Sequence, residues 1–153
     1  DIRYHLADIP LPNGVLRVDK VSVPRPTTIR LGHYTLPFEQ PEAVQSYTSP
    51  KLPEATIVSN GDYSLATIPL YGWDTTLTRF PEGIHPVSHQ CALTMTEKQV
   101  SGEHIMLTLM LWKKGDKPFT KKELTPVKSF RISDDLKSVD ILFADKTRKQ
   151  VKF

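Results

Sequence analysis

The chain has 153 residues, of which 24% are charged, and a formal net charge of +3, a composition typical of a single globular domain. Its longest strongly apolar run, 105–112, is much shorter than the roughly 20 residues of a membrane-spanning helix, which argues against a membrane span. Cys91 is the only cysteine, which excludes an internal disulfide, and 13 prolines spread along the chain leave little room for helices.

The first part of the chain predicts short strands separated by turns. Residues 2–7 are expected to form a strand, and "LPNG" is expected to form the turn after it. Residues 15–23 predict a second strand, in which the apolar alternation slips by one position between Val18 and Val21. A bulge near Asp19 would explain this slip, because one inserted residue moves the later side chains to the other face.

The next part predicts a strand, a loop and a hairpin. Residues 28–36 alternate as a strand, and the four prolines of 37–54 indicate a long loop. The dipeptide Asn60-Gly61 lies between two apolar runs, "ATIVS" and "YSLATIPLY". This pattern is the strongest short-range signal for a β-hairpin, because both residues accept a positive φ angle.

A central strand is predicted after a further turn. Residues 89–97 alternate as a strand, and "SGE" at 101–103 predicts a tight turn before "HIMLTLMLW". Apolar side chains alternate there on both faces, which is typical of a strand covered on both sides. One face carries Ile105, Leu107, Leu109 and Leu111, and the other carries Met106, Met110 and Trp112 with Thr108.

Three short strands, 127–133, 138–144 and 148–153, are predicted to close the chain as a meander. The expected inward side chains are Val139, Ile141, Phe143, Val151 and Phe153, and the expected solvent side chains are Asp140, Arg148, Lys149 and Lys152. The whole pattern predicts a single all-β domain over 1–153, an antiparallel β-sandwich of about nine to eleven strands, with a β-barrel as the alternative.

The positive charge is concentrated near the end of the chain. Residues 113–153 hold twelve Lys/Arg and six Asp/Glu, whereas residues 1–112 hold eight and eleven. Because the lysines alternate with apolar residues, as in "RKQVKF", they are expected to form the solvated face of a strand. No nucleic-acid motif accompanies them, so no nucleic-acid partner is predicted. Weak attraction to acidic glycans is an interpretation between a purely solvated face and a nucleic-acid groove.

The segment "YGWDTTLTRFPEGIHPVSHQ", residues 71–90, is the main candidate for a site. Its prolines and glycines predict a structured loop at a sheet edge. Aromatic rings there can stack on sugar rings, and an arginine can pair with a carboxylate. A similar composition occurs in "RLGHY". The predicted carbohydrate-binding residues are Tyr34, Tyr71, Trp73, Arg79, His85 and His89.

Other interpretations of this segment remain open. Trp73 and Phe80 could plug the end of the sandwich, while His85 and His89 bond to turn carbonyls. The two histidines are four residues apart, a spacing that serves zinc on a helix, but Pro86 between them disfavours a helical turn. No metal site and no cofactor are therefore predicted.

Acid–base chemistry is a further interpretation of the same residue types. A lyase acting on a uronic-acid polysaccharide needs a base that removes a carbon-bound proton and a group that neutralises the sugar carboxylate. The edge of a sandwich alone is too open to exclude water, so no catalytic residue is assigned. The side chains of suitable type are Tyr71, Arg79, His85 and His89.

Three stretches carry a resemblance to a known group of proteins: "RVDKVSVPRPTTIRLGHYTLP", "SNGDYSLATIPLYGWDTTLTRFPEGIHPV" and "SVDILFADKTRKQVKF". Together they resemble the C-terminal β-sandwich of bacterial, Bacteroidetes-type glycan-processing proteins. In heparinase-like polysaccharide lyases and related families, this sandwich follows a helical (α/α) toroid. The resemblance implies a periplasmic or extracellular protein whose catalytic groups lie mostly on the toroid and at the interdomain cleft.

Two functions follow from these observations. The first is a non-catalytic C-terminal domain of a polysaccharide lyase or glycoside hydrolase, a fragment of a larger chain whose partners are a polysaccharide and an upstream domain. That domain would leave an exposed apolar patch where the two meet. The second is a self-standing carbohydrate-binding module, with an aromatic platform formed by Tyr34, Tyr71 and Trp73.

Overall fold

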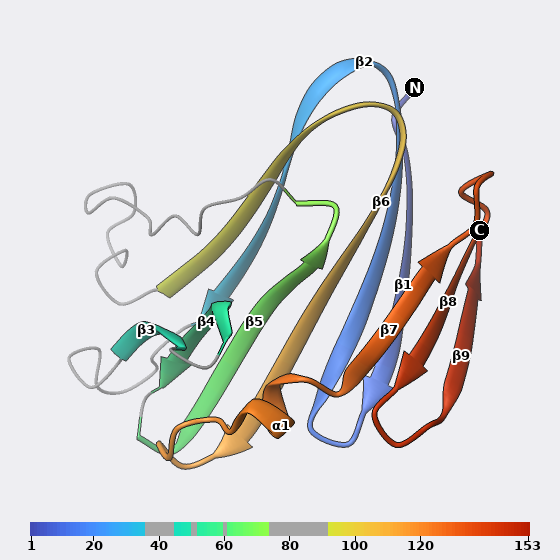
Figure 1. Cartoon of the computed structure of the whole chain (residues 1–153). Helices are drawn as coiled ribbons and strands as arrows, with labels where there is room; N and C mark the ends of the chain where they lie inside the picture. The colour runs from blue at the N-terminus through green and yellow to red at the C-terminus, as the bar shows by residue number, and fades with distance from the viewer. Residues whose placement is uncertain (36–44, 50–51, 60, 74–91) are drawn as a thin grey trace, which may run out of the picture.

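The structure is a computed structural model that describes all residues except 36–44, 50–51, 60 and 74–91. Two antiparallel sheets make up the described chain, which confirms the predicted all-β class (Figure 1). The large sheet has six strands in the order β1 (Arg3–Leu11), β2 (Gly14–Thr35), β6 (Ala92–Lys114), β5 (Tyr63–Tyr71), β4 (Leu52–Ser59) and β3 (Gln45–Ser49). The small sheet has three strands in the order β7 (Val127–Ile132), β8 (Ser138–Phe143) and β9 (Arg148–Lys152).

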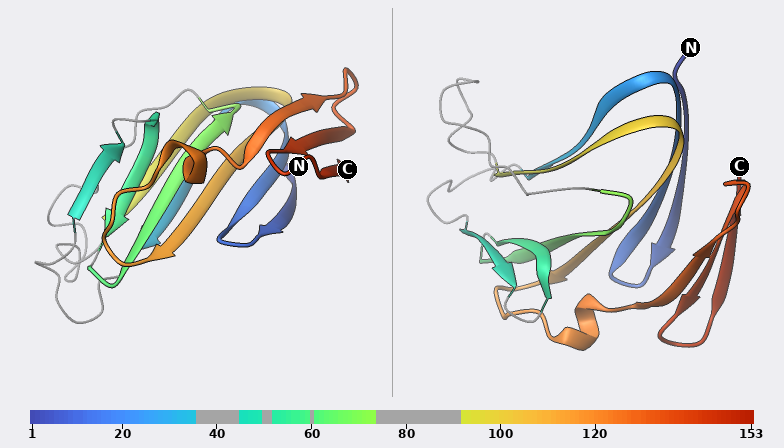
Figure 2. Two further views of the ribbon diagram at one scale, coloured as in Figure 1. Left: turned by 60° about the horizontal axis from the view of Figure 1, so that its bottom comes forward. Right: turned by 45° about the horizontal axis from the view of Figure 1, so that its top comes forward.

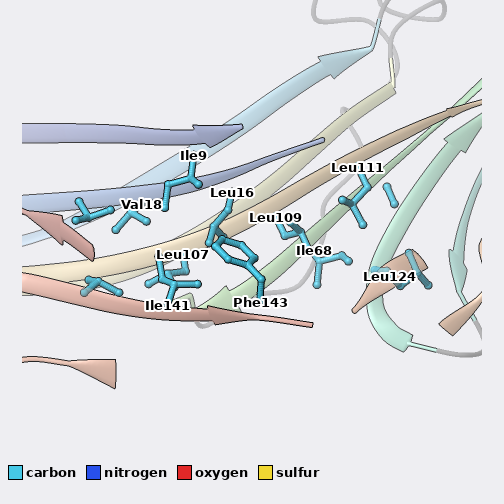
Figure 3. Packing of buried hydrophobic residues seen from close by; sticks show 14 of the residues in the cluster. Ile9, Leu16, Val18, Ile68, Leu107, Leu109, Leu111, Leu124, Ile141 and Phe143 are labelled. Carbon is cyan, nitrogen blue, oxygen red and sulfur yellow. The ribbon is translucent and has the colours of Figure 1, made fainter. Parts of the chain in front are cut away.

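The two sheets enclose one main hydrophobic core. The small sheet lies against the β1, β2 and β6 part of the large sheet, while β3 and β4 lie at the opposite edge (Figure 2). Apolar side chains from both sheets meet between them, so the architecture is a sandwich and not a barrel. Figure 3 shows the main contributors: Ile9, Leu16, Val18, Ile68, Leu107, Leu109, Leu111, Leu124, Ile141 and Phe143.

Strands β2 and β6 are much longer than predicted. The register from Gly14 to Thr35 shifts only between Val23 and Thr27, and the two strands bend together there (Figure 1). Gly102, opposite Val23, has a φ of 74°, which lets the chain bend without reversing. The prediction of a tight turn at 101–103 is therefore wrong, because these residues form a bend within one strand.

The predicted bulge near Asp19 is also wrong. The ladder that β2 forms with β1 is regular from Gly14 to Ser22, and the ladder that it forms with β6 is regular from Gly14 to Val23. Leu16 and Val18 point toward the small sheet, whereas Asp19 and Val21 lie on the other side, and all four side chains are buried. The apparent slip arises because both faces of β2 are covered, so apolar residues occur at even and odd positions without any inserted residue.

The Asn60-Gly61 hairpin is confirmed by the pairing of β4 with β5. Ser59 lies opposite Ser64, and Gly61 has a φ of 89°. The long loop expected over 37–54 is partly wrong, because β3 lies within this range and β4 begins in it.

The closing meander has the predicted strands and orientation. Val139 lies opposite Val151, and the buried side chains of β8 alternate with exposed Asp140. Before it, the four-residue helix α1 (Lys121–Leu124) begins with a capping box between Thr120 and Glu123. No helix in the described part of the chain is long and apolar enough to cross a membrane.

Lys20 connects the two sheets through a polar contact. Its Nζ atom donates a hydrogen bond of 2.8 Å to the backbone carbonyl of Leu136 and lies 3.3 Å from a Glu103 carboxylate oxygen. The Phe153 ring lies below the same ammonium group and contacts the His5 ring at 6.4 Å between centroids. The first strand and the last residue therefore lie at the same end of the sandwich (Figure 2).

Candidate functional site

The candidate segment starts where β5 ends, and its first three residues are described. Tyr71 lies opposite Leu107 and points toward the small sheet, where its ring contacts Phe130 edge-on at 5.5 Å. Gly72 follows with a φ of 82° and turns the chain. Trp73 consequently points to the other side of the large sheet, away from Tyr71, so these two side chains do not form one platform.

Trp73 is half-buried at the bend of β2 and β6. Its indole Nε1 donates a hydrogen bond of 3.1 Å to the hydroxyl oxygen of the fully buried Thr108. The indole also packs on four apolar residues, which we call the bend cluster: Val21, Val23, Val100 and Met106. This packing gives Trp73 a structural role in addition to any role in binding.

A histidine that was not singled out from the sequence lies beside this turn. The His104 Nε2 atom is 2.9 Å from the carbonyl oxygen of Gly72, so the histidine ring fixes the start of the candidate segment. In the register, His104 lies opposite Val21, and Val21 lies opposite Tyr4. A row of side chains thus runs from the edge strand β1 across β2 to β6.

We use the term outer face for the side of the large sheet that points away from the small sheet. Neighbouring rows of this face bring together ionisable side chains from β1, β2 and β6. The Arg17 guanidinium donates two parallel hydrogen bonds, of 3.0 and 3.1 Å, to the Asp8 carboxylate. The chemistry-bearing residues of the outer face are Tyr4, Asp8, Arg17, Asp19, Trp73 and His104.

Asp19 is an unusual carboxylate because it is only 1% exposed. The Tyr4 hydroxyl donates a hydrogen bond to its Oδ1 atom, while Oδ2 has no hydrogen-bond partner within the described residues. Burial raises the pKa of Asp19, although the Tyr4 hydrogen bond and the positive charge of Arg17 oppose this shift. Burial and the contact with Asp19 also raise the pKa of Tyr4, which therefore stays a hydrogen-bond donor at neutral pH.

This raised pKa predicts a pH dependence of stability. At a pH between the unfolded-state pKa of about 3.9 and the raised folded-state pKa, the folded protein binds more protons than the unfolded chain. The contribution of Asp19 to the free energy of unfolding therefore falls as pH rises through this range. Asp19→Asn removes this titration. Denaturant unfolding from pH 3 to 7 should show wild type losing stability relative to Asp19→Asn as pH rises.

The exposed Asp145 supplies a control of opposite sign. Hydrogen bonds from the Thr147 side chain and backbone lower the pKa of Asp145. The contribution of Asp145 to the free energy of unfolding is therefore present above its unfolded-state pKa and is lost as pH falls. Wild type should consequently gain stability relative to Asp145→Asn as pH rises. A wild-type to Asp19→Asn difference that stays constant with pH would contradict the proposed burial of a titrating carboxyl.

The outer face brings together side chains of the types that bind polar ligands. It offers an indole ring, a carboxylate-bound guanidinium and the Tyr4–Asp19 pair, all suited to hydrogen bonding and stacking. Within the described ranges, no group of three His, Cys, Asp or Glu side chains is placed to hold a metal ion. The side chains present can orient a polar ligand.

Four of the six predicted binding residues cannot be placed as side chains. Arg79, His85 and His89 lie outside the described residues, and Tyr34 is described only by its backbone pairing with Leu93 on β6. Sequence reasoning missed Tyr4, Asp19 and His104. Their only signal was a polar residue within an apolar alternation, and the strand register is needed to see that they are neighbours.

Comparisons with known proteins reveal a likeness to a solved structure. No protein-family model matches the chain, and no curated protein matches it. Among solved structures, the chain is similar to a heparinase III with methylated lysines, at a TM-score of 0.51 and 11% identity. The likeness covers 99% of this chain and 26% of the heparinase III chain, so this chain spans only a part of that protein's length. At this identity the likeness shows a related fold.

Proposed function

We propose that this chain is a non-catalytic C-terminal β-sandwich domain that supports a polysaccharide-degrading enzyme in the periplasm or outside the cell. The observation that carries the proposal is the likeness to heparinase III, which extends over 99% of this chain but only 26% of that protein. In this proposal the module contributes surface and positioning, while the remaining part of the larger enzyme carries the reaction.

The edge strand β1 supports an interdomain role. Two large apolar side chains on it, Tyr4 and Leu6, are 54% and 45% exposed and lie on the outer face, and Ile2, directly before the strand, is 63% exposed. Contiguous apolar surface of this kind is typical of a docking site. We propose that the helical domain of the same enzyme covers this strand and brings its active site close to Trp73 and His104.

Activity measurements test this proposal. The chain alone, incubated with heparan sulfate, hyaluronan, chondroitin sulfate and alginate, is expected to form no unsaturated uronate products detectable by ultraviolet absorbance. The coding sequence upstream of Asp1 is expected to encode amphipathic helices. The longer protein should depolymerise one of these polymers, and deletion of residues 1–153 should abolish that activity.

Two results would overturn the proposal. Release of unsaturated products by the chain alone would show that the domain is itself catalytic. A coding sequence with no preceding helical domain would remove the supporting role, and glycan binding by such a protein would favour the self-standing carbohydrate-binding module.

A further inference from the structure

The small sheet has a second polar surface, far from the outer face described above. The strands β7, β8 and β9 pack one face on the core, and their other face forms an open hollow of about 590 Å³, which we call the basic groove. Its lining residues include Ser129, Arg131, Asp140, Leu142, Arg148 and Gln150. None of these residues belongs to the candidate segment 71–90.

The strand register orders the basic groove into rows. Arg131 lies opposite Asp140, and Asp140 lies opposite Gln150, so a cation, a carboxylate and an amide lie side by side across three strands. The Gln150 Nε2 atom donates a hydrogen bond of 2.8 Å to Asp140 Oδ1, which orients both side chains. The next row places Arg148 beside Leu142.

A rigid scaffold holds these side chains. Val139, Ile141 and Val151 alternate with the groove residues along β8 and β9 and are buried in the core. The groove residues Arg131 and Arg148 are exposed. Their substitution therefore changes the surface chemistry without removing contacts from the core.

The basic groove carries an excess of positive charge. Arg131 and Arg148 line it together with a single carboxylate, Asp140. Within the described residues, no ion pair joins these two cations to a carboxylate, so their donors are available to an external anion. The exposed Lys128 and further basic residues of the closing strands add to the same positive field.

We propose that the basic groove binds an acidic polysaccharide through its carboxylate or sulfate groups. The proposal rests on the proposed function for the polymer class, and it adds a binding surface separate from Trp73 and His104. From ideal strand spacing, the Cα atoms of Arg131 and Arg148 are roughly 12 Å apart, so two anionic groups of one extended chain can be bound together.

The Asp140–Gln150 pair favours a saccharide over a nucleic acid. A carboxylate oxygen and an amide oxygen accept hydrogen bonds from sugar hydroxyls, which every unit of a polysaccharide supplies. A nucleic-acid backbone presents a phosphate at each step and would place negative charge against Asp140. Alternation of cations with acceptors therefore matches a polymer that carries both anions and hydroxyl donors.

Binding measurements with matched variants test the basic groove. Heparan sulfate and hyaluronan oligosaccharides serve as sulfated and carboxylate-only probes, and a DNA duplex serves as the nucleic-acid probe. The double variant Arg131→Gln/Arg148→Gln is expected to bind the acidic oligosaccharides at least tenfold more weakly than wild type. If the double variant loses binding to both oligosaccharides, the two arginines recognise the carboxylate groups. If it loses binding to heparan sulfate alone, they recognise the sulfate groups.

The double variant Lys121→Gln/Lys122→Gln is the matched control, since it removes two exposed charges from α1. It should retain binding within about twofold, because the lost charges lie outside the groove and surface charges are screened by salt. Asp140→Ala removes the carboxylate acceptor and should weaken oligosaccharide binding while leaving DNA binding unchanged or stronger. Circular dichroism of each variant checks that it is folded.

Three outcomes would overturn the inference: no binding of either oligosaccharide by wild type, equal losses in the two double variants, or tighter binding of DNA that depends on Arg131 and Arg148. These outcomes concern binding by the chain alone. They leave the activity result of the longer protein unchanged, so failure of the basic groove and failure of the proposed enzyme role can be distinguished.

Discussion

Replacing Leu107 by alanine is expected to lower the free energy of unfolding by about 2–5 kcal/mol, because a buried leucine loses its transfer energy and leaves a cavity. Leu107 is fully buried in the central strand β6 and belongs to the core between the sheets. For a domain of this size, the loss corresponds to a decrease in melting temperature of roughly 4–20 °C. Thermal and urea unfolding followed by circular dichroism would measure it.

Leu6→Ala is the matched control for this substitution. Leu6 is 45% exposed on the edge strand β1, so the same chemical change should alter stability by about 0.5 kcal/mol or less. Similar losses at Leu107 and Leu6 would contradict the placement of the core between the two sheets.

Gly72→Ala is expected to destabilise the protein by about 2–5 kcal/mol, combining a left-handed conformation with steric overlap. Gly72 has a φ of 82°, and a Cβ atom there would overlap the backbone carbonyl of Ile105 and approach the Met106 side chain to 2.9 Å. The substitution should also displace Trp73 and weaken the contact of His104 with the Gly72 carbonyl. Urea unfolding, with tryptophan fluorescence as a local probe, would show both effects.

Gly61→Ala separates the cost of the left-handed conformation from the cost of steric overlap. Gly61 has a similar φ of 89°, but no atom lies within 4 Å of the position its Cβ would take. This variant should lose only the conformational part, about 1–2 kcal/mol. If both alanine variants lost the same free energy, the close approach of β6 to Gly72 would be contradicted.

The strand composition of the fold could be predicted because it depends on local signals. Prolines exclude long helices, and Asn60-Gly61 specifies a hairpin that the pairing of Ser59 with Ser64 confirms. The alternation in 138–144 places Val139 and Ile141 in the core, as observed. These signals act over a few residues, so tertiary contacts do not reverse them.

The continuity of the long strands could not be predicted from the same signals. A glycine between polar residues, as at Gly102, is compatible with a chain reversal and with a bend inside one strand. Pairing of Val23 with Gly102 decides between them, and such pairing depends on residues about eighty positions apart. The helix α1 was missed although Thr120 and Glu123 have the spacing of a capping box.

The arrangement of the candidate site could not be predicted from the sequence. The sequence indicates that aromatic and ionisable residues gather at 71–90, but the φ of Gly72 sends Tyr71 and Trp73 to opposite sides of the sheet. The neighbourhood of Tyr4 and His104 arises from pairing of three strands. Register across a sheet is a non-local property, which a single sequence does not reveal.

Strands β2 and β6 bend together, and we call the paired halves beyond the bend the arm. Beyond the bend, residues 27–35 and 92–100 pair with each other, and the arm curves away from the small sheet (Figure 2). An angular displacement of the arm about Gly102 would move Val100 relative to Val21 and Met106, and would thereby change the packing around the Trp73 indole. A molecule held at the far end of the arm would thereby be mechanically coupled to Trp73, while the layers of the sandwich stay in place.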